Sequence, residues 1–271
     1  MEENRMNMIV CVKQVPDPEV PPAKFRIDAK TKQVIPPEGI PPVINPFDER
    51  ALELALRLKD AYGGKITVLT MGSAKSESVV KRGISMGADD GFVLSDPSFQ
   101  DSDSFGTAHI LAAAIQKIGN YDLILCGRQA SDWDEGVVGS IIAENLSLPF
   151  ITLALAIEAA DKALKVKRVT TDGYQVFSVP VPAMVTVCWD VGRPRLPSGS
   201  GVIMAARKKI PVWSAADIGV DAGQVGKGAA RKEAAELSRR EWARKCEIIQ
   251  AETPDEAGTK LAEKLREVGA F

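Results

Sequence analysis

The stretch YDLILCGRQASDWDEGVVGS, residues 121–140, decides the fold. Its first part, up to Gly127, is a short apolar run of the kind that forms a buried strand. A polar turn follows, and Gly136 and Gly139 leave the backbone bare where a new apolar segment begins. Amides at a helix N-terminus bind phosphate, and Ser140 adds a hydroxyl. We therefore predict a strand, a turn that holds the phosphates of a nucleotide, and a helix start.

The same kind of unit is repeated on the N-terminal side. Apolar, β-branched runs alternate with segments whose apolar residues have helical spacing. We predict strands at 8–15, 65–71, 91–95 and 121–127, and helices at 46–62, 73–86, 105–118 and 136–148. Four alternations are typical of a parallel sheet with helices on both faces. The predicted fold class is therefore α/β, with a Rossmann-like, doubly wound, mostly parallel sheet.

The first predicted helix has clear ends. Asn45 is a capping residue type, Pro46 suits the first helical position, and Asp48 and Glu49 put negative charge in the first turn. The glycine pair at 63–64 ends the helix. We predict that the Asn45 side chain caps it.

The pattern changes after residue 150. Short alternating segments at 151–156, 164–170, 174–179 and 184–187, with a turn at 171–173, predict an antiparallel extension of the sheet. The proline-rich stretch 16–43 is predicted as a surface loop with a small hairpin, and 191–216 as a loop that leads into a short element. We predict a nucleotide-binding body at 1–222 and a C-terminal arm at 223–271, with an amphipathic helix at 254–268 that needs a partner.

Composition excludes several classes of function. The chain has 271 residues, 26% of them charged and 45% hydrophobic, and a formal net charge of -2. These values are those of an ordinary globular protein and give no reason to propose nucleic acid or an anionic membrane as partner. The N-terminal sequence predicts neither a signal peptide nor a transmembrane segment, so we expect a cytoplasmic protein.

Neither a metal site nor a catalytic constellation is predicted. The four cysteines are far apart and form no C-x-x-C pair, so we interpret them as reduced, mostly buried thiols. The single histidine, His109, lies on an apolar helical segment and is interpreted as a core or edge residue. We predict that the chain is not itself an enzyme.

Open parallel sheets bind ligands beyond the carboxyl ends of their strands. That rule selects the turn at 11–14, the helix start at Asn45, the turn at 70–73 and the turn at 127–140.

Three acids, Asp132, Asp134 and Glu135, stand in the predicted phosphate turn. One interpretation is that they cap and charge-complement the helix start. The other is that they bind ribose hydroxyls or orient a flavin. Trp133, in the same turn, has three interpretations: stacking on an aromatic ring, a subunit interface, or packing within the chain.

Five motifs together resemble one known family. They are CVKQVPD at 11–17, INPFDERALELALRLKD at 44–60, VKRGISMGADDGFVL at 80–94, DLILCGRQASDWDEGVVG at 122–139 and PRLPSGSGVIMAARKKI at 194–210. In this order they resemble the β subunit of an electron-transfer flavoprotein, over about residues 7–222.

The resemblance implies a Rossmann-like domain with a C-terminal arm that embraces a larger α subunit, which carries an FAD. In ordinary members the β subunit holds AMP, and in electron-bifurcating members it holds a second FAD. The nucleotide contacts implied for this chain are the backbones of Cys11 and Met71, with Asn45, Gly127 and the turn 132–140. In that turn they are Asp132, Gly136, Val137, Val138, Gly139 and Ser140.

The chain departs from the family pattern in two places. Val137 stands where a glutamine is common, and Glu135 where a small or polar residue is common. The docking segment that presents a leucine to an acyl-CoA dehydrogenase corresponds to Leu196, Pro197, Ser198 and Gly199, with Gly199 at the leucine position. Without that anchor side chain the docking contact weakens, and the redox partner can differ.

We expect a β subunit of a heterodimeric electron carrier that binds FAD or AMP and passes electrons between a dehydrogenase and a redox partner. Electron bifurcation, with NADH as donor, is expected if the bound nucleotide is FAD. FAD is favoured because Gly136 and Gly139 leave room, and a bulky residue at 139 is expected to lower nucleotide content while the sheet stays folded.

Two other functions fit part of the sequence. An ATP-using adenine-nucleotide α/β enzyme would need a Ser- and Gly-rich loop directly after the first strand, where the chain has Lys13–Pro16. A non-catalytic stress-type nucleotide-binding protein would leave the second half unexplained.

Overall fold

The fold was analysed in a computed structural model that describes residues 5–28, 30–35, 37–160, 163–238 and 246–270. The chain forms two compact units, Met1–Glu236 and Leu237–Phe271. Each is described by itself.

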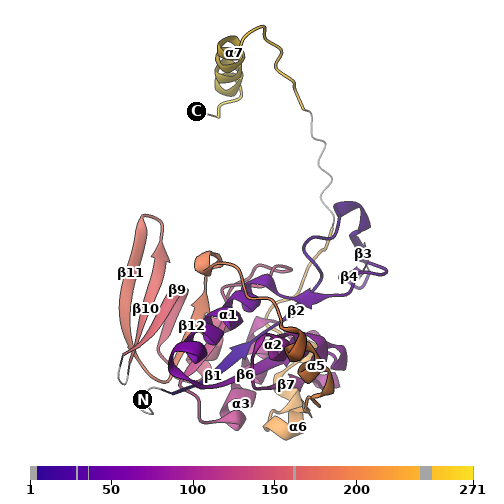
Figure 1. Cartoon of the computed structure of the whole chain (residues 1–271). Helices are drawn as coiled ribbons and strands as arrows, with labels where there is room; N and C mark the ends of the chain where they lie inside the picture. The colour runs from indigo at the N-terminus through magenta and orange to yellow at the C-terminus, as the bar shows by residue number, and fades with distance from the viewer. Residues whose placement is uncertain (1–4, 29, 36, 161–162, 239–245, 271) are drawn as a thin grey trace. The chain divides into compact units, whose positions relative to one another are not determined.

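A nine-stranded sheet runs through the larger unit, in the order β11-β10-β9-β12-β8-β1-β6-β7-β13 (Figure 1). Its strands are β1 (Met6–Cys11), β6 (Gly64–Met71), β7 (Asp90–Leu94), β8 (Leu123–Gly127), β9 (Phe150–Ala160), β10 (Ala163–Thr170), β11 (Gly173–Pro180), β12 (Ala183–Val187) and β13 (Val212–Trp213). The pairs from β9–β12 to β7–β13 are parallel, whereas β10 is antiparallel to both of its neighbours, β9 and β11. The predicted fold class is confirmed.

Helices cover both faces of this sheet. Helices α1 (Pro46–Tyr62), α2 (Glu77–Met86) and α5 (Gly199–Arg207) bury apolar side chains in the core on one face. Helices α3 (Ser104–Ile118), α4 (Val138–Asn145) and α6 (Ala215–Ile218) do so on the other. Two cores on opposite faces are what a doubly wound sheet requires.

The segment 184–187 was predicted wrongly as an antiparallel strand. It lies in β12, between β8 and β9 and parallel to both. All five residues of β12 are buried. Strands buried on both faces have continuous apolar sequences rather than alternating ones, and AMVTV is such a sequence.

Other predictions need smaller corrections. The predicted strand 8–15 is two elements, β1 and β2 (Gln14–Val15), and β2 pairs with β5 (Val43–Ile44). The predicted hairpin is confirmed as β3 (Arg26–Asp28) and β4 (Gln33–Ile35). The stretch 191–216, predicted mostly as loop, contains α5 and the edge strand β13.

The two compact units divide after Glu236, and the division into a nucleotide-binding body and an arm at 222/223 stays a prediction. Residues 223–236 belong to the compact unit that ends at Glu236. The smaller unit contains α7 (Pro254–Glu267), close to the predicted helix 254–268. Thr253 caps α7 by accepting a hydrogen bond from the Glu256 amide. None of the residues of α7 is buried.

Helix α5 approaches α2 closely because of a glycine. A methyl group at Gly201 would overlap the backbone carbonyl oxygen of Ser85, whereas one at Gly199 would meet nothing. Both glycines lie in the first turn of α5, so replacing either of them by alanine raises the helix propensity by a similar amount.

We predict that Gly201→Ala lowers the free energy of unfolding by about 1–3 kcal/mol, because α5 must move off α2. Gly199→Ala is the matched control and should be neutral or raise stability by up to about 1 kcal/mol. Urea unfolding of the two variants measures both values. Equal stability of the two variants would contradict the close approach.

Candidate functional site

The carboxylate of Asp48 joins the ends of two neighbouring strands. One oxygen accepts a hydrogen bond from the amide of Lys13, just beyond β1, at 2.8 Å. The other accepts from the amide of Gly127, at the end of β8, also at 2.8 Å. Asp48 is buried in the first turn of α1, so this helix start is fixed to both strand ends.

Burial raises the pKa of Asp48 to about 6, although hydrogen bonds from Asn45, Gly127 and Lys13 and the charge of Lys13 lower it in part. Burying a carboxylate here costs desolvation energy. The two hydrogen bonds that it accepts from backbone amides offset part of this cost.

Asn45 holds the next part of the chain. Its position at the helix start is as predicted, but its side chain does not cap α1, and that prediction is wrong. Its amide donates to the carbonyl of Gln129 at 2.8 Å, and its oxygen accepts from the amide of Ser131 at 3.2 Å. The side chain is therefore used to shape the turn after β8.

Gly127 is required by close packing. A Cβ atom there would lie 2.5 Å from Cβ of Phe47 and 2.7 Å from a carboxylate oxygen of Asp48. Any larger residue would push α1 away from the end of β8 and break the Asp48 bridge.

The turn 128–137 leads into a helix start with no side-chain cap. Gly136 has a φ of 66°, which favours glycine, and α4 begins at Val138 rather than at the predicted Gly136. Val137 stands at the N-cap position and cannot cap. The first amides of α4, at Val138, Gly139 and Ser140, therefore have no intrahelical acceptor.

Ser131 adds a polar group that is buried and unused. Its hydroxyl oxygen has no hydrogen-bond partner within the described part of the chain. A buried hydroxyl without a partner is costly, so a ligand that supplies one is favoured here.

The three acids of the turn do not cap α4, so the capping part of that interpretation is wrong. The first turn of α4 contains no acid. Asp132 forms an ion pair with Lys13 at 2.7 Å. Asp134 accepts a hydrogen bond from the side-chain amide of Gln129 at 2.6 Å. Glu135 contacts the hydroxyl of Ser104, the first residue of α3. Trp133 is 54% exposed, so it is not packed within the chain.

Gly139 serves packing against the sheet. A Cβ atom there would lie 2.8 Å from Cγ2 of Thr186 and 3.0 Å from Sγ of Cys126. A bulky residue at 139 would therefore displace α4 from the sheet, and the expectation that nucleotide content falls while the sheet stays folded remains a prediction. The hydroxyl of Ser140 donates to the carbonyl of Val137 at 2.7 Å and retains its acceptor capacity.

The remaining predicted residues lie along the same sheet edge. Cys11 ends β1 and Met71 ends β6, and β8, β1 and β6 are adjacent and parallel. Cys11, Met71, Gly127 and the turn are therefore brought together as predicted. Burial raises the pKa of the Cys11 thiol to about 12, so it is neutral and a poor nucleophile.

Sequence analysis missed three residues that build the site: Lys13, Asp48 as a bridge, and Ser131. Lys13 and Ser131 were read only as parts of turns, and Asp48 as an ordinary first-turn acid. Their partners are 35 to 119 residues away, so no local pattern identifies them.

The family model of the electron transfer flavoprotein domain matches residues 34–218. The chain belongs to the electron transfer flavoprotein family.

Three relatives illustrate the match. An electron transfer flavoprotein subunit beta of Thermoanaerobacterium thermosaccharolyticum is 40% identical, covering 82% of this chain and 83% of that protein. The subunit beta of Clostridium acetobutylicum is 37% identical, over 97% and 98%. A caffeyl-CoA reductase-Etf complex subunit of Acetobacterium woodii is 36% identical, also over 97% and 98%.

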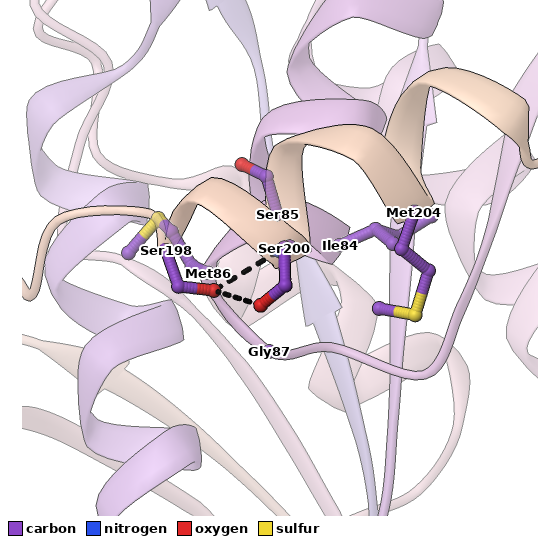
Figure 2. Close-up of a pocket in the computed structure, with 8 residues that line it drawn as sticks. Ile84, Ser85, Met86, Gly87, Ser198, Ser200 and Met204 are labelled. Atoms are coloured by element: carbon purple, nitrogen blue, oxygen red, sulfur yellow. Dashed lines mark hydrogen bonds between the residues drawn. The ribbon is translucent and has the colours of Figure 1, made fainter.

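The predicted family resemblance is confirmed, and the match includes residues 196–199, which were predicted to dock a redox partner. There Leu196 is 82% exposed. Ser198 caps α5 by accepting a hydrogen bond from the amide of Gly201 at 3.0 Å, and Gly199 begins the helix. A depression of about 200 Å³ lies between α2 and α5, and Ser198, Ser200 and Met204 line one side of it (Figure 2).

Glu53 holds this segment to α1. The buried carboxylate accepts from the backbone amide of Arg195 at 3.0 Å and from its Nε at 2.9 Å. Arg57 bonds to the same carboxylate and to the carbonyl of Val191. Leu196 therefore projects from a fixed backbone.

No helix in the described ranges is long and apolar enough to cross a membrane. Among the same residues, no group of three or more His, Cys, Asp or Glu side chains could hold a metal ion.

The pKa of Asp48 gives a pH prediction. Because the folded pKa of about 6 exceeds the ordinary aspartate pKa of 3.8, the folded state binds more protons between these values, and stability falls as pH rises through them. Against Asp48→Asn, which cannot titrate, wild-type stability should fall by roughly 2–3 kcal/mol from pH 4 to pH 7. Urea unfolding across this range measures the difference. A stability difference that is independent of pH would contradict the buried carboxylate.

Proposed function

We propose that this chain is the β subunit of a heterodimeric electron transfer flavoprotein. In this proposal it binds an adenine nucleotide beyond β1, β6 and β8 and supports the passage of electrons between a dehydrogenase and a redox partner. The observation that carries the proposal is the uncapped start of α4, held at the end of β8 by Asp48 and Asn45. Family membership favours this function over an ATP-using enzyme or a stress-type protein.

The nucleotide phosphates would occupy the start of α4. The amides of Val138, Gly139 and Ser140 are donors there, and the positive end of the helix dipole favours an anion. The Ser131 hydroxyl is a further partner because it is buried and unpaired among the described residues. The backbones at Cys11 and Met71 would line the remainder of the nucleotide.

The acids of the turn are compatible with phosphate because each is already engaged. Asp132 is neutralised by Lys13 at 2.7 Å, and Asp134 is bonded to Gln129. Glu135 is directed to the start of α3. Repulsion of a phosphate is reduced accordingly, since opposite charges and bonded donors compensate these carboxylates.

FAD is the nucleotide that we propose, with AMP as the alternative, and electron bifurcation with NADH as donor follows only from FAD. Purification of the heterodimer, extraction of its nucleotides and measurement of their masses decide between them. Two flavins per heterodimer support FAD in this chain. One flavin and one AMP would contradict it and indicate the ordinary type.

The partners that we propose are the α subunit and an acyl-CoA dehydrogenase or similar redox protein. The C-terminal arm predicted at 223–271 suits the α subunit because none of the residues of its helix α7 is buried. The segment Leu196, Pro197, Ser198 and Gly199 suits the redox partner. One relative is named as a subunit of a caffeyl-CoA reductase complex. We propose the cytoplasm as compartment, since all four cysteines are free thiols.

Substitutions at the N-cap of α4 test the phosphate site. We predict that Val137→Asp caps the helix, raising stability by about 0.5–1 kcal/mol, yet weakens AMP binding by about tenfold or more through charge repulsion. Val137→Asn is the matched control, since it caps equally without the charge. Calorimetric titration of both full-length variants with AMP and FAD measures the effect. Equal affinities for the two variants would place the phosphates elsewhere.

Truncation of Leu196 tests the docking segment. We predict that Leu196→Ala leaves the heterodimer intact and raises the KM for an acyl-CoA dehydrogenase partner by about tenfold, with kcat unchanged. Val212→Ala, which truncates an exposed apolar side chain on the edge strand β13, is the control. Steady-state reduction of the heterodimer by the dehydrogenase gives both constants. An unchanged KM would exclude Leu196 from docking.

A further inference from the structure

Of the three acids in the turn, Glu135 is the nearest in sequence to the uncapped start of α4. It precedes the N-cap residue Val137 by two positions, so the two Cα atoms are within about 7 Å of each other. That distance is shorter than the screening length at physiological ionic strength. An ionised, uncompensated Glu135 would therefore repel a phosphate bound at α4.

A lysine from a distant part of the chain compensates this charge. Nζ of Lys232 lies 3.3 Å from a carboxylate oxygen of Glu135. The hydroxyl of Ser104 contacts the same oxygen. Since Ser104 opens α3, the carboxylate also lies at the positive end of that helix.

The segment that carries Lys232 is fixed to the start of α3. Asp103 accepts hydrogen bonds from the amides of Phe105 and Gly106 with one oxygen. Its other oxygen accepts from the backbone amides of Arg231 and Lys232, at 2.7 and 3.2 Å. One carboxylate thus caps α3 and holds the root of the C-terminal arm, which we define as residues 230–234.

Further contacts hold the arm root in the same place. The guanidinium of Arg231 lies 4.6 Å from the ring centroid of Phe105. Nζ of Lys32 donates to the carbonyl of Ala234 at 2.6 Å and pairs with Glu233 at 3.5 Å. Lys232 therefore reaches Glu135 from a backbone with several attachments.

We propose that Lys232 is a positioning residue of the nucleotide site, which holds the Glu135 charge at α3 and away from the phosphates. The inference rests on the proposed nucleotide site. It has a consequence for the arm: if docking of the arm root favours nucleotide binding, the nucleotide must favour docking of the arm root by the same factor. Occupancy of the nucleotide site is then linked to the order of the chain that leads into the arm.

The test is a double-mutant cycle on the full-length chain, titrated calorimetrically with AMP and with FAD. Lys232→Gln should weaken binding by about two- to fivefold, the range of a partly exposed ion pair. In the background of Glu135→Gln the same lysine change should have no effect, because no charge remains to be held. Lys227→Gln, at an exposed lysine for which the described part of the chain shows no ion pair, controls for the loss of one positive charge.

Hydrogen exchange supplies the reciprocal readout. In the wild type, AMP should slow hydrogen exchange of the Arg231 and Lys232 amides by about the same factor by which Lys232→Gln weakens binding, two- to fivefold. In Glu135→Gln, AMP should leave this exchange unchanged. Equal weakening by Lys232→Gln in both backgrounds, or none in the wild type, would overturn this inference while the nucleotide site stands. Absence of AMP and FAD binding to the wild type would overturn the proposed function instead, and this inference with it.

Discussion

The buried carboxylate of Asp48 is the constraint on which the rest of the site depends. It is the acceptor for the amides of Lys13 and Gly127, so it fixes the ends of β1 and β8 to the first turn of α1. Burial disfavours its charge and raises its pKa to about 6. A protein tolerates such a cost where the alternative is two unsatisfied backbone amides. Gly127 and Asn45 have their roles only because α1 starts at this point.

The site could be located from the sequence, because strands, helices and turn glycines have local signals. The glycines at 127, 136 and 139 and the proline at 46 mark where backbone conformation or close packing leaves little choice. The rule that open sheets bind at their carboxyl ends then selects the edge at which these turns lie. What the rule cannot supply is the direction in which each residue faces. In the sequence Gly139 suits a phosphate turn, yet in the fold the side on which a Cβ atom would stand packs against Thr186 and Cys126.

Long-range polar pairs could not be predicted, and they change the interpretation of the turn. In the sequence the acids 132, 134 and 135 are three charges within four residues beside a helix start, and capping is the natural interpretation. In the fold each acid has its own partner. Asp132 pairs with Lys13 and Asp134 with Gln129. Glu135 contacts Ser104 and Lys232. Likewise, β12 was assigned by its order along the chain, whereas its burial on both faces decides its place.

Helix α1 connects the two functional regions proposed for this chain. Its first turn holds the strand ends through Asp48, and its next turns hold the connection after β12. Arg50 donates to the carbonyl of Trp189, Arg57 to that of Val191, and Glu53 accepts from Arg195. A packed helix transmits displacement along its axis with little loss, because close-packed interiors are hardly compressible. Helix α1 therefore holds both the strand ends at the proposed nucleotide site and the backbone that presents Leu196.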